Sequence, residues 1–113
     1  MKVEQIGDWT LEDRLAMHGP PLVVMFFRMD ERRQRLLQGE FRRLAGEHRD
    51  ARFYEVDLVE NPSLVEKYSI ATQPMVLAFV DGVEVGRHAG MRVSPMVDRV
   101  LGPSPSPDDG CEE

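Results

Sequence analysis

The chain has 113 residues, 42% of them hydrophobic, and a formal net charge of −6 at pH 7. This length supports one domain with a hydrophobic core and excludes two. A net negative protein binds nucleic acid poorly, and no apolar run approaches the roughly 20 residues that a membrane span needs. We therefore expect a single domain that binds neither nucleic acid nor a membrane.

The N-terminus and the cysteine content bear on where the protein acts. The segment Met1 to Gln5 contains an acid and does not continue into an apolar core, unlike a secretory signal peptide. The single cysteine, Cys111, agrees with a reducing compartment and excludes an intrachain disulfide. We expect a cytoplasmic monomer, two copies of which can be linked through Cys111 on oxidation.

Strand and helix patterns alternate in the first half of the chain. Val3 to Ile6 fits a short edge strand, and a helix follows from the capping-box-like segment Thr10 to Asp13 and ends near Gly19. The continuous apolar run Leu22 to Phe27 has the length of a strand, and we place it in the centre of a sheet. From Asp30 to His48 the apolar residues recur at helical spacing and predict a long helix. Its predicted apolar face consists of Leu36, Leu37, Phe41, Leu44 and Ala45.

The second half contains three strands and two helices. Arg52 to Asp57 is predicted to be a strand. Asn61-Pro62 begins a short helix to about Tyr68, because an asparagine oxygen can cap free N–H groups and proline lacks the N–H that would go unpaired. Met75 to Val80 fits a strand covered on both faces, and the turn Asp81-Gly82 pairs it with Val83 to Val85. Ser94-Pro95 begins a last helix to about Leu101 in the same way.

The predicted order is therefore β-α-β-α-β-α-β-β-α, an α/β domain over residues 1–101 with a central mixed β-sheet and helices on both faces. Residues 102–113 are rich in proline, serine and acids and contain no large apolar side chain. Such a segment cannot offset the entropy of ordering, so we expect a disordered tail.

Several residues of the second half have the spacing of a known family. The chain resembles the thioredoxin family, whose NP…Y.I…P…F..G…G pattern it matches over much of this half. The matching residues are Asn61-Pro62, Tyr68, Ile70, Gln73-Pro74, Phe79, Asp81-Gly82 and Gly90. The resemblance covers about residues 3–101 and implies the thioredoxin fold, with a cis peptide bond at Gln73-Pro74.

The chemistry of that family depends on two cysteines at the start of the long helix. In an ungapped register Asp30 and Arg33 occupy their positions, and a one-residue insertion would put Gln34 in the second. A carboxylate, a guanidinium or an amide cannot replace a thiolate nucleophile. Val24 and Glu55 stand where family members commonly have a buried acid and a lysine that move protons. The comparison implies a redox-inactive member without disulfide reductase activity.

Other catalytic chemistry has little support in the sequence. Acids such as Asp30-Glu31 are favoured at a helix N-terminus by the helix dipole. His18, His48 and His88 lack metal-ligand spacing, and we read them as surface residues. We therefore expect no metal and no cofactor. The alternative function is an oxidoreductase-type enzyme acting through Cys111, whose acidic neighbours disfavour the thiolate, or through the Asp30 region.

The peptide-binding groove of the family can remain when the cysteines are absent. The resemblance places this groove at Met29, at Gln73, Pro74 and Met75, and at Gly90 and Met91. Methionines are flexible and polarizable, which suits varied peptides. The alternative is that Met75 is simply buried in the core.

Positive charge is concentrated near the predicted groove. Between Arg28 and Arg52 there are eight arginines and five acids. Arg32 and Arg33 could steer an acidic partner to the groove, or the arginines could form a solvated helix face. We predict a peptide- or protein-binding adaptor or chaperone. Cysteine-free thioredoxin-like proteins of hydrogenase maturation are a precedent within the family.

Overall fold

Five strands form one mixed sheet with the order β1-β3-β2-β4-β5. A computed structural model describes residues 3–28, 31–90 and 92–102, apart from the side chains of residues 8 and 9. The strands are β1 (Glu4–Gln5), β2 (Leu22–Phe27), β3 (Arg52–Asp57), β4 (Met75–Val80) and β5 (Val83–Ala89). β1, β3 and β2 run parallel, whereas β4 is antiparallel to both β2 and β5. The predicted α/β architecture and its mixed central sheet are confirmed.

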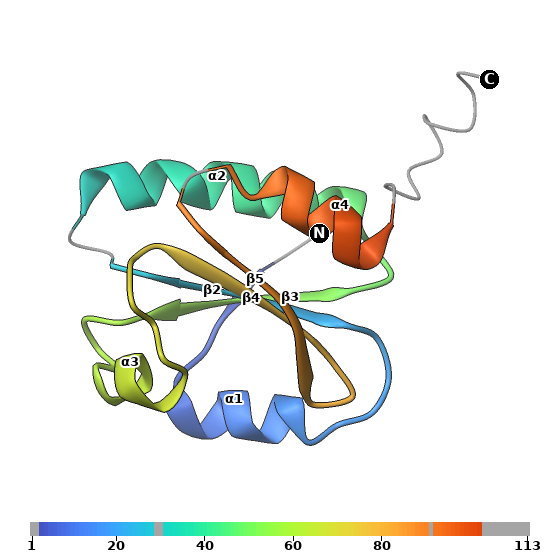
Figure 1. Cartoon of the computed structure of the whole chain (residues 1–113), viewed down its shortest axis with the longest axis horizontal. Coiled ribbons are helices and arrows are strands. Elements are labelled where there is room, and N and C mark those ends of the chain that lie inside the picture. The colour runs from blue at the N-terminus through green and yellow to red at the C-terminus, as the bar shows by residue number, and fades with distance from the viewer. Residues whose placement is uncertain (1–2, 29–30, 91, 103–113) are drawn as a thin grey trace.

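Two helices cover each face of the sheet, as Figure 1 shows. The helices are α1 (Asp8–Leu15), α2 (Arg32–Glu47), α3 (Ser63–Lys67) and α4 (Ser94–Leu101). α2 and α4 lie on one face, and α1 and α3 lie on the other (Figure 1). Among the described residues, no helix is long and apolar enough to cross a membrane.

The central strand β2 is buried along its whole length. Side chains of a strand alternate between the two faces of a sheet, so β2 contributes to two cores. Val24 and Phe26 pack in the core under α1 and α3, while Val23 and Phe27 pack in the core under α2 and α4. An unbroken apolar run is what this position requires, because neither face of β2 meets water.

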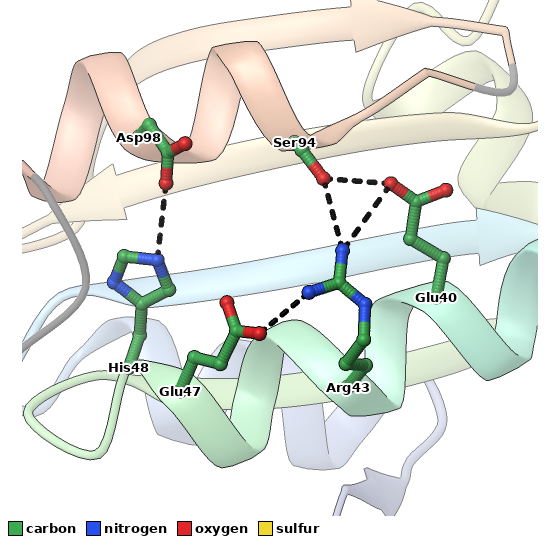
Figure 2. Close-up of polar contacts among 6 residues, drawn as sticks. All are labelled: Glu40, Arg43, Glu47, His48, Ser94 and Asp98. Carbon is green, nitrogen blue, oxygen red and sulfur yellow. Dashed lines mark hydrogen bonds and ion pairs between the residues drawn. The ribbon is translucent and has the colours of Figure 1, made fainter. Parts of the chain in front are cut away.

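Polar side chains join α2 to α4 across the top of the second core (Figure 2). The Ser94 hydroxyl donates to Glu40 Oε2 at 2.6 Å. Arg43 donates to Glu47 Oε2 at 2.5 Å and to Ser94 Oγ at 3.5 Å. These bonds hold the first turn of α4 against the middle of α2.

Two predictions about side-chain exposure are wrong. His48 is not at the surface: it is fully buried, with its Nε2 atom 3.2 Å from Asp98 Oδ1 and its ring against Phe53 (Figure 2). It follows the last turn of α2 directly beneath α4, and sequence periodicity does not report that contact. Leu36 is 68% exposed, because the apolar stripe of α2 is centred on its neighbour Leu37 and on Phe41.

The three predicted side-chain caps are also wrong. Thr10 lies inside α1, whose N-cap is Gly7 and which has no side-chain cap. The Asn61 amide donates to the carbonyl oxygen of Asp57 at 3.0 Å, and α3 has no side-chain cap. Ser94 is engaged by Glu40, and α4 likewise begins without a side-chain cap. Asn61 bonds within the turn that precedes α3, whereas Ser94 bonds to a tertiary partner.

The structure describes one element as longer than predicted. β5 extends to Ala89 because its ladder with β4 continues past an irregularity at Ala78 and Phe79 as far as the pair Met75 and Ala89. This extension brings Gly90 beside the start of β4, which matters for the candidate site.

Two glycines provide a matched test of this packing. An added Cβ at Gly86 of β5 would lie 2.9 Å from Val100 Cγ2 of α4, whereas a Cβ at Gly39 of α2 would meet nothing within 4 Å. We expect Gly86→Ala to lower the free energy of unfolding by about 1–3 kcal/mol, because α4 must shift. Gly39→Ala should raise it by about 0.5–1 kcal/mol through helix propensity. Urea unfolding measures both; a Gly86→Ala variant as stable as wild type would contradict the close approach of α4 to β5.

Candidate functional site

A cavity of about 210 Å³ opens beside Pro74, and we call it the Pro74 cavity. It is lined by Glu31, Arg33, Gln34, Gln73, Pro74 and Gly90. The peptide bond between Gln73 and Pro74 is cis, the isomer that the resemblance implies. Segments from the start of α2, the start of β4 and the end of β5 thus meet around one hollow.

Hydrogen bonds fix the walls of the Pro74 cavity. The backbone N–H of Arg28 donates to Gln34 Oε1 at 2.6 Å, which ties the end of β2 to the first turn of α2. On the other side the N–H of Gly90 donates to the Pro74 carbonyl at 3.1 Å. Gly90 has φ +103, a conformation that glycine adopts without steric cost.

The backbone of Gln73 is available for bonding. Among the described residues, none accepts its N–H or donates to its carbonyl, and its side chain is half-buried. The next residue, Pro74, is buried and has its carbonyl engaged by Gly90. Free backbone N–H and C=O groups are what an added peptide strand binds.

A second cavity, of about 320 Å³, is also lined by Gln73, and we call it the Val59 cavity. It is lined by Arg28, Leu58, Val59, Pro62, Val65 and Gln73. Sequence reasoning missed this cavity. One signal for it was Val59, an apolar residue in a predicted loop. In the structure Val59 is 49% exposed. Gln73 therefore forms a wall shared by two hollows.

The predicted groove residues do not all lie where the sequence places them. Gln73, Pro74 and Gly90 line the Pro74 cavity, together with Arg33 and Gln34 from the positions matched to the family's second cysteine. Met75 does not line it: its side chain is 5% exposed and packs in the core under α1 and α3. The reason is strand alternation, since Met75 shares a face with Leu77 and Phe79.

Part of the prediction lies outside the described residues. This holds for Met29, Asp30 and Met91, and for residues 103–113 with Cys111. Over the described ranges no group of three His, Cys, Asp or Glu side chains could hold a metal ion.

The arginines of α2 fall into two groups. Arg42 is paired with Glu55, and Arg43 is paired with Glu40 and Glu47. In the part of the chain that the structure describes, Arg32 and Arg33 at the start of the helix have no acidic partner. These two arginines are therefore free to meet an acidic group, although the N-cap residue Glu31 lines the same cavity as Arg33.

The position matched to the family's proton-moving lysine holds a fully buried carboxylate, Glu55. Arg42 donates to both of its oxygens, at 3.0 and 3.1 Å, and Gln38 donates at 2.8 Å. The hydrogen bonds from Arg42 to Glu55, and the charge of that carboxylate, raise the pKa of Arg42. Val24 packs on the opposite face of the sheet, so Glu55 and Val24 do not form a pair. Glu55 is thus bound to α2 and does not face the other core.

Solved structures show that the chain has the thioredoxin fold. Thioredoxin f2 of Chlamydomonas reinhardtii is similar with a TM-score of 0.82 and 19% identity, over 91% of this chain and 100% of that one. Schistosoma mansoni thioredoxin is similar with a TM-score of 0.79 and 26% identity, over 88% of this chain and 93% of that one. The short form of spinach chloroplast thioredoxin f has a TM-score of 0.80 at 20% identity, over 88% of this chain and 90% of that one. No protein-family model and no curated protein matches the sequence.

The buried carboxylate allows a test of what holds α2 to the sheet. Arg42→Ala should lower the free energy of unfolding by about 2–3 kcal/mol, because it removes the charge that compensates Glu55. The expected loss is below that of a pair buried on both sides, since Arg42 is 56% exposed and water can partly replace it. Arg43→Ala, which removes an exposed pair, should cost at most about 1 kcal/mol.

A second substitution separates charge from packing in this test. Glu55→Leu in the Arg42→Ala background should restore much of the lost stability, because no uncompensated charge then remains buried. If the double variant is less stable than Arg42→Ala alone, the carboxylate stabilises the fold through Gln38 instead. Chemical denaturation with a common m-value would be the measurement.

Proposed function

We propose that this protein is a redox-inactive, thioredoxin-like adaptor or chaperone that binds an extended peptide or partner segment in the groove around Pro74. The observation that carries the proposal is the backbone of Gln73. Its N–H and C=O have no partner among the described residues, and Gln73 lines two cavities. A peptide can add as a strand there and place side chains in both hollows.

The composition of the groove supports recognition over thiol chemistry. Arg33 and Gln34 supply a guanidinium and an amide to the cavity wall, and neither group can attack a disulfide. The sequence has one cysteine, Cys111, which stands among acids that disfavour its thiolate. A protein with a single unactivated thiol lacks the pair of sulfurs that reduction and resolution require. Its lone cysteine also supports a place in the cytoplasm.

The charges favour an acidic partner. Arg33 lies in the wall of the Pro74 cavity, and Arg32 precedes it in the chain. Both side chains are exposed, and neither has an acidic partner among the described residues. Complementary charge mainly accelerates association and is screened by salt. Apolar contacts and backbone hydrogen bonds would then determine how long the complex lasts.

Insulin reduction tests the absence of disulfide chemistry and the alternative enzyme together. The electron donor is dithiothreitol or a thioredoxin reductase. With the purified full chain added, insulin should be reduced no faster than by the donor alone, because the chain has no cysteine pair. A Cys111→Ser variant is the matched control for the only thiol, and Asp30→Ala is the control for the Asp30 region. Turnover above the donor alone that is lost in either variant would support the enzyme.

Charge reversal tests the groove. The probe is a set of peptides selected by the immobilised full chain from a random 12-residue library, measured by fluorescence anisotropy. Arg33→Glu should weaken their binding about three- to tenfold, since it replaces an attractive exposed charge with a repulsive one. Higher salt should reduce the difference between the two proteins.

The matched control for this variant is Arg99→Glu, on the last turn of α4. Arg99 is equally exposed and has no acidic partner among the described residues, and the variant changes the net charge by the same amount. Binding that responds to Arg99→Glu as strongly as to Arg33→Glu would mean that overall charge acts and the groove does not. Failure to select any peptide would overturn the binding proposal itself.

A further inference from the structure

We infer that the Val59 cavity is a specificity subsite that takes a large apolar side chain of the bound peptide, such as leucine, methionine or phenylalanine. The inference rests on the proposed function and adds the chemistry of the ligand. Among the described residues that line it, Leu58, Val59, Pro62 and Val65 are apolar. The cavity of about 320 Å³ has room for one large side chain.

The turn that carries Val59 is fixed before any ligand binds. The carboxylate of Asp57, itself buried, accepts the N–H of Val59 at 3.0 Å. The carbonyl of Asp57 accepts the N–H of Glu60 at 3.2 Å and both the N–H and the side-chain amide of Asn61 at 3.0 Å. Leu58 is tied to the end of β2 by an N–H bond to the Phe27 carbonyl at 2.8 Å.

These bonds hold the turn while the apolar side chain of Val59 stays partly exposed. The turn is held by its neighbours, and Val59 itself remains half exposed at the edge of a hollow. Nothing in the hydrogen bonding of the turn requires an apolar side chain there. A rigid turn that presents an apolar group to a partly apolar hollow is suited to bury a partner's side chain at little entropic cost.

The position of Gln73 connects this subsite to the groove. Gln73 lines both cavities, and a peptide residue bonded to its backbone has neighbours on either side along the extended chain. Alternate side chains of an extended peptide are about 6–7 Å apart and point the same way. One neighbour therefore reaches the Val59 cavity while the other reaches the Pro74 cavity with Arg33.

The residues that line the two cavities indicate which kind of peptide would bind. A peptide that is only acidic would pair with Arg33 but leave the apolar side chains of the Val59 cavity in contact with water. A large apolar side chain removes those side chains from water and gains affinity in proportion to the area buried. The ligand class is thus an extended peptide with a large apolar residue close to an acidic one.

The test uses the full chain and the random 12-residue peptide library as the probe. Peptides selected by wild type should share a large apolar residue at one fixed position of their alignment. Val59→Ser should weaken their binding about tenfold without adding charge, whereas Val59→Ile should bind as wild type. The matched control is Val83→Ser on β5, which removes a valine that is 63% exposed from another surface and should have no effect.

A double-mutant cycle then locates the contact. Replacing the shared apolar residue of a selected peptide by serine should weaken binding to wild type about tenfold and should abolish the difference between wild type and Val59→Ser. Thermal unfolding of each variant separates a loss of fold from a loss of contact.

The outcomes distinguish the two proposals. Peptides that bind but share no apolar position, or that bind Val59→Ser within twofold of wild type, overturn the subsite and leave the groove standing. If the library yields no binding peptide at all, the groove proposal fails and the subsite fails with it.

Discussion

The candidate site depends on the register of the central strand β2. Phe27 at its end is paired with Asp57 of β3, and Phe26 is paired with Met75 of β4. Arg28 and Leu58 directly follow the first pair, and Gln73 comes two residues before Met75. The register therefore brings these three residues together at one end of the central strands, where they line the same cavity. A shift of one residue would turn the apolar side chains of a strand to the opposite face, so burial of β2 on both sides fixes the site as well as the fold.

Sequence patterns predicted the elements better than their ends and contacts. The apolar run of β2 and the helical spacing of α2 report burial directly, and both elements are where the patterns place them. Asn61 and Ser94 fit local capping rules, yet Asn61 bonds back to Asp57 in the preceding turn and Ser94 bonds to Glu40 of α2. The second partner is distant in the chain and cannot be found by a local rule. His48 is buried by α4, which is fifty residues away in the chain.

The site could be predicted in part for the same reason. Gln73, Pro74 and Gly90 were found because the resemblance gives their positions, while Met75 was misplaced because its side-chain direction depends on the strand phase. The Val59 cavity needs Leu58, Val65 and Gln73 from separate segments, and no spacing in the sequence relates them. Arg32 and Arg33 also contradict a local rule: cations are unfavourable near a helix N-terminus, by about 0.3–1 kcal/mol each, and α2 has no acid in its first turn. Violations of this kind are expected where function has outweighed stability.

The fixed turn after β3 has a thermodynamic consequence for any complex that this protein forms. Because Asp57 already orders the turn, little backbone entropy remains to be lost on this side of the interface. In the proposed complex most of the ordering cost would fall on the peptide, which would give up its own chain freedom to lie extended along Gln73. Affinity would then be set largely by how extended the partner segment already is before it binds. A segment held open within a larger protein would bind more tightly than the same residues in a free peptide.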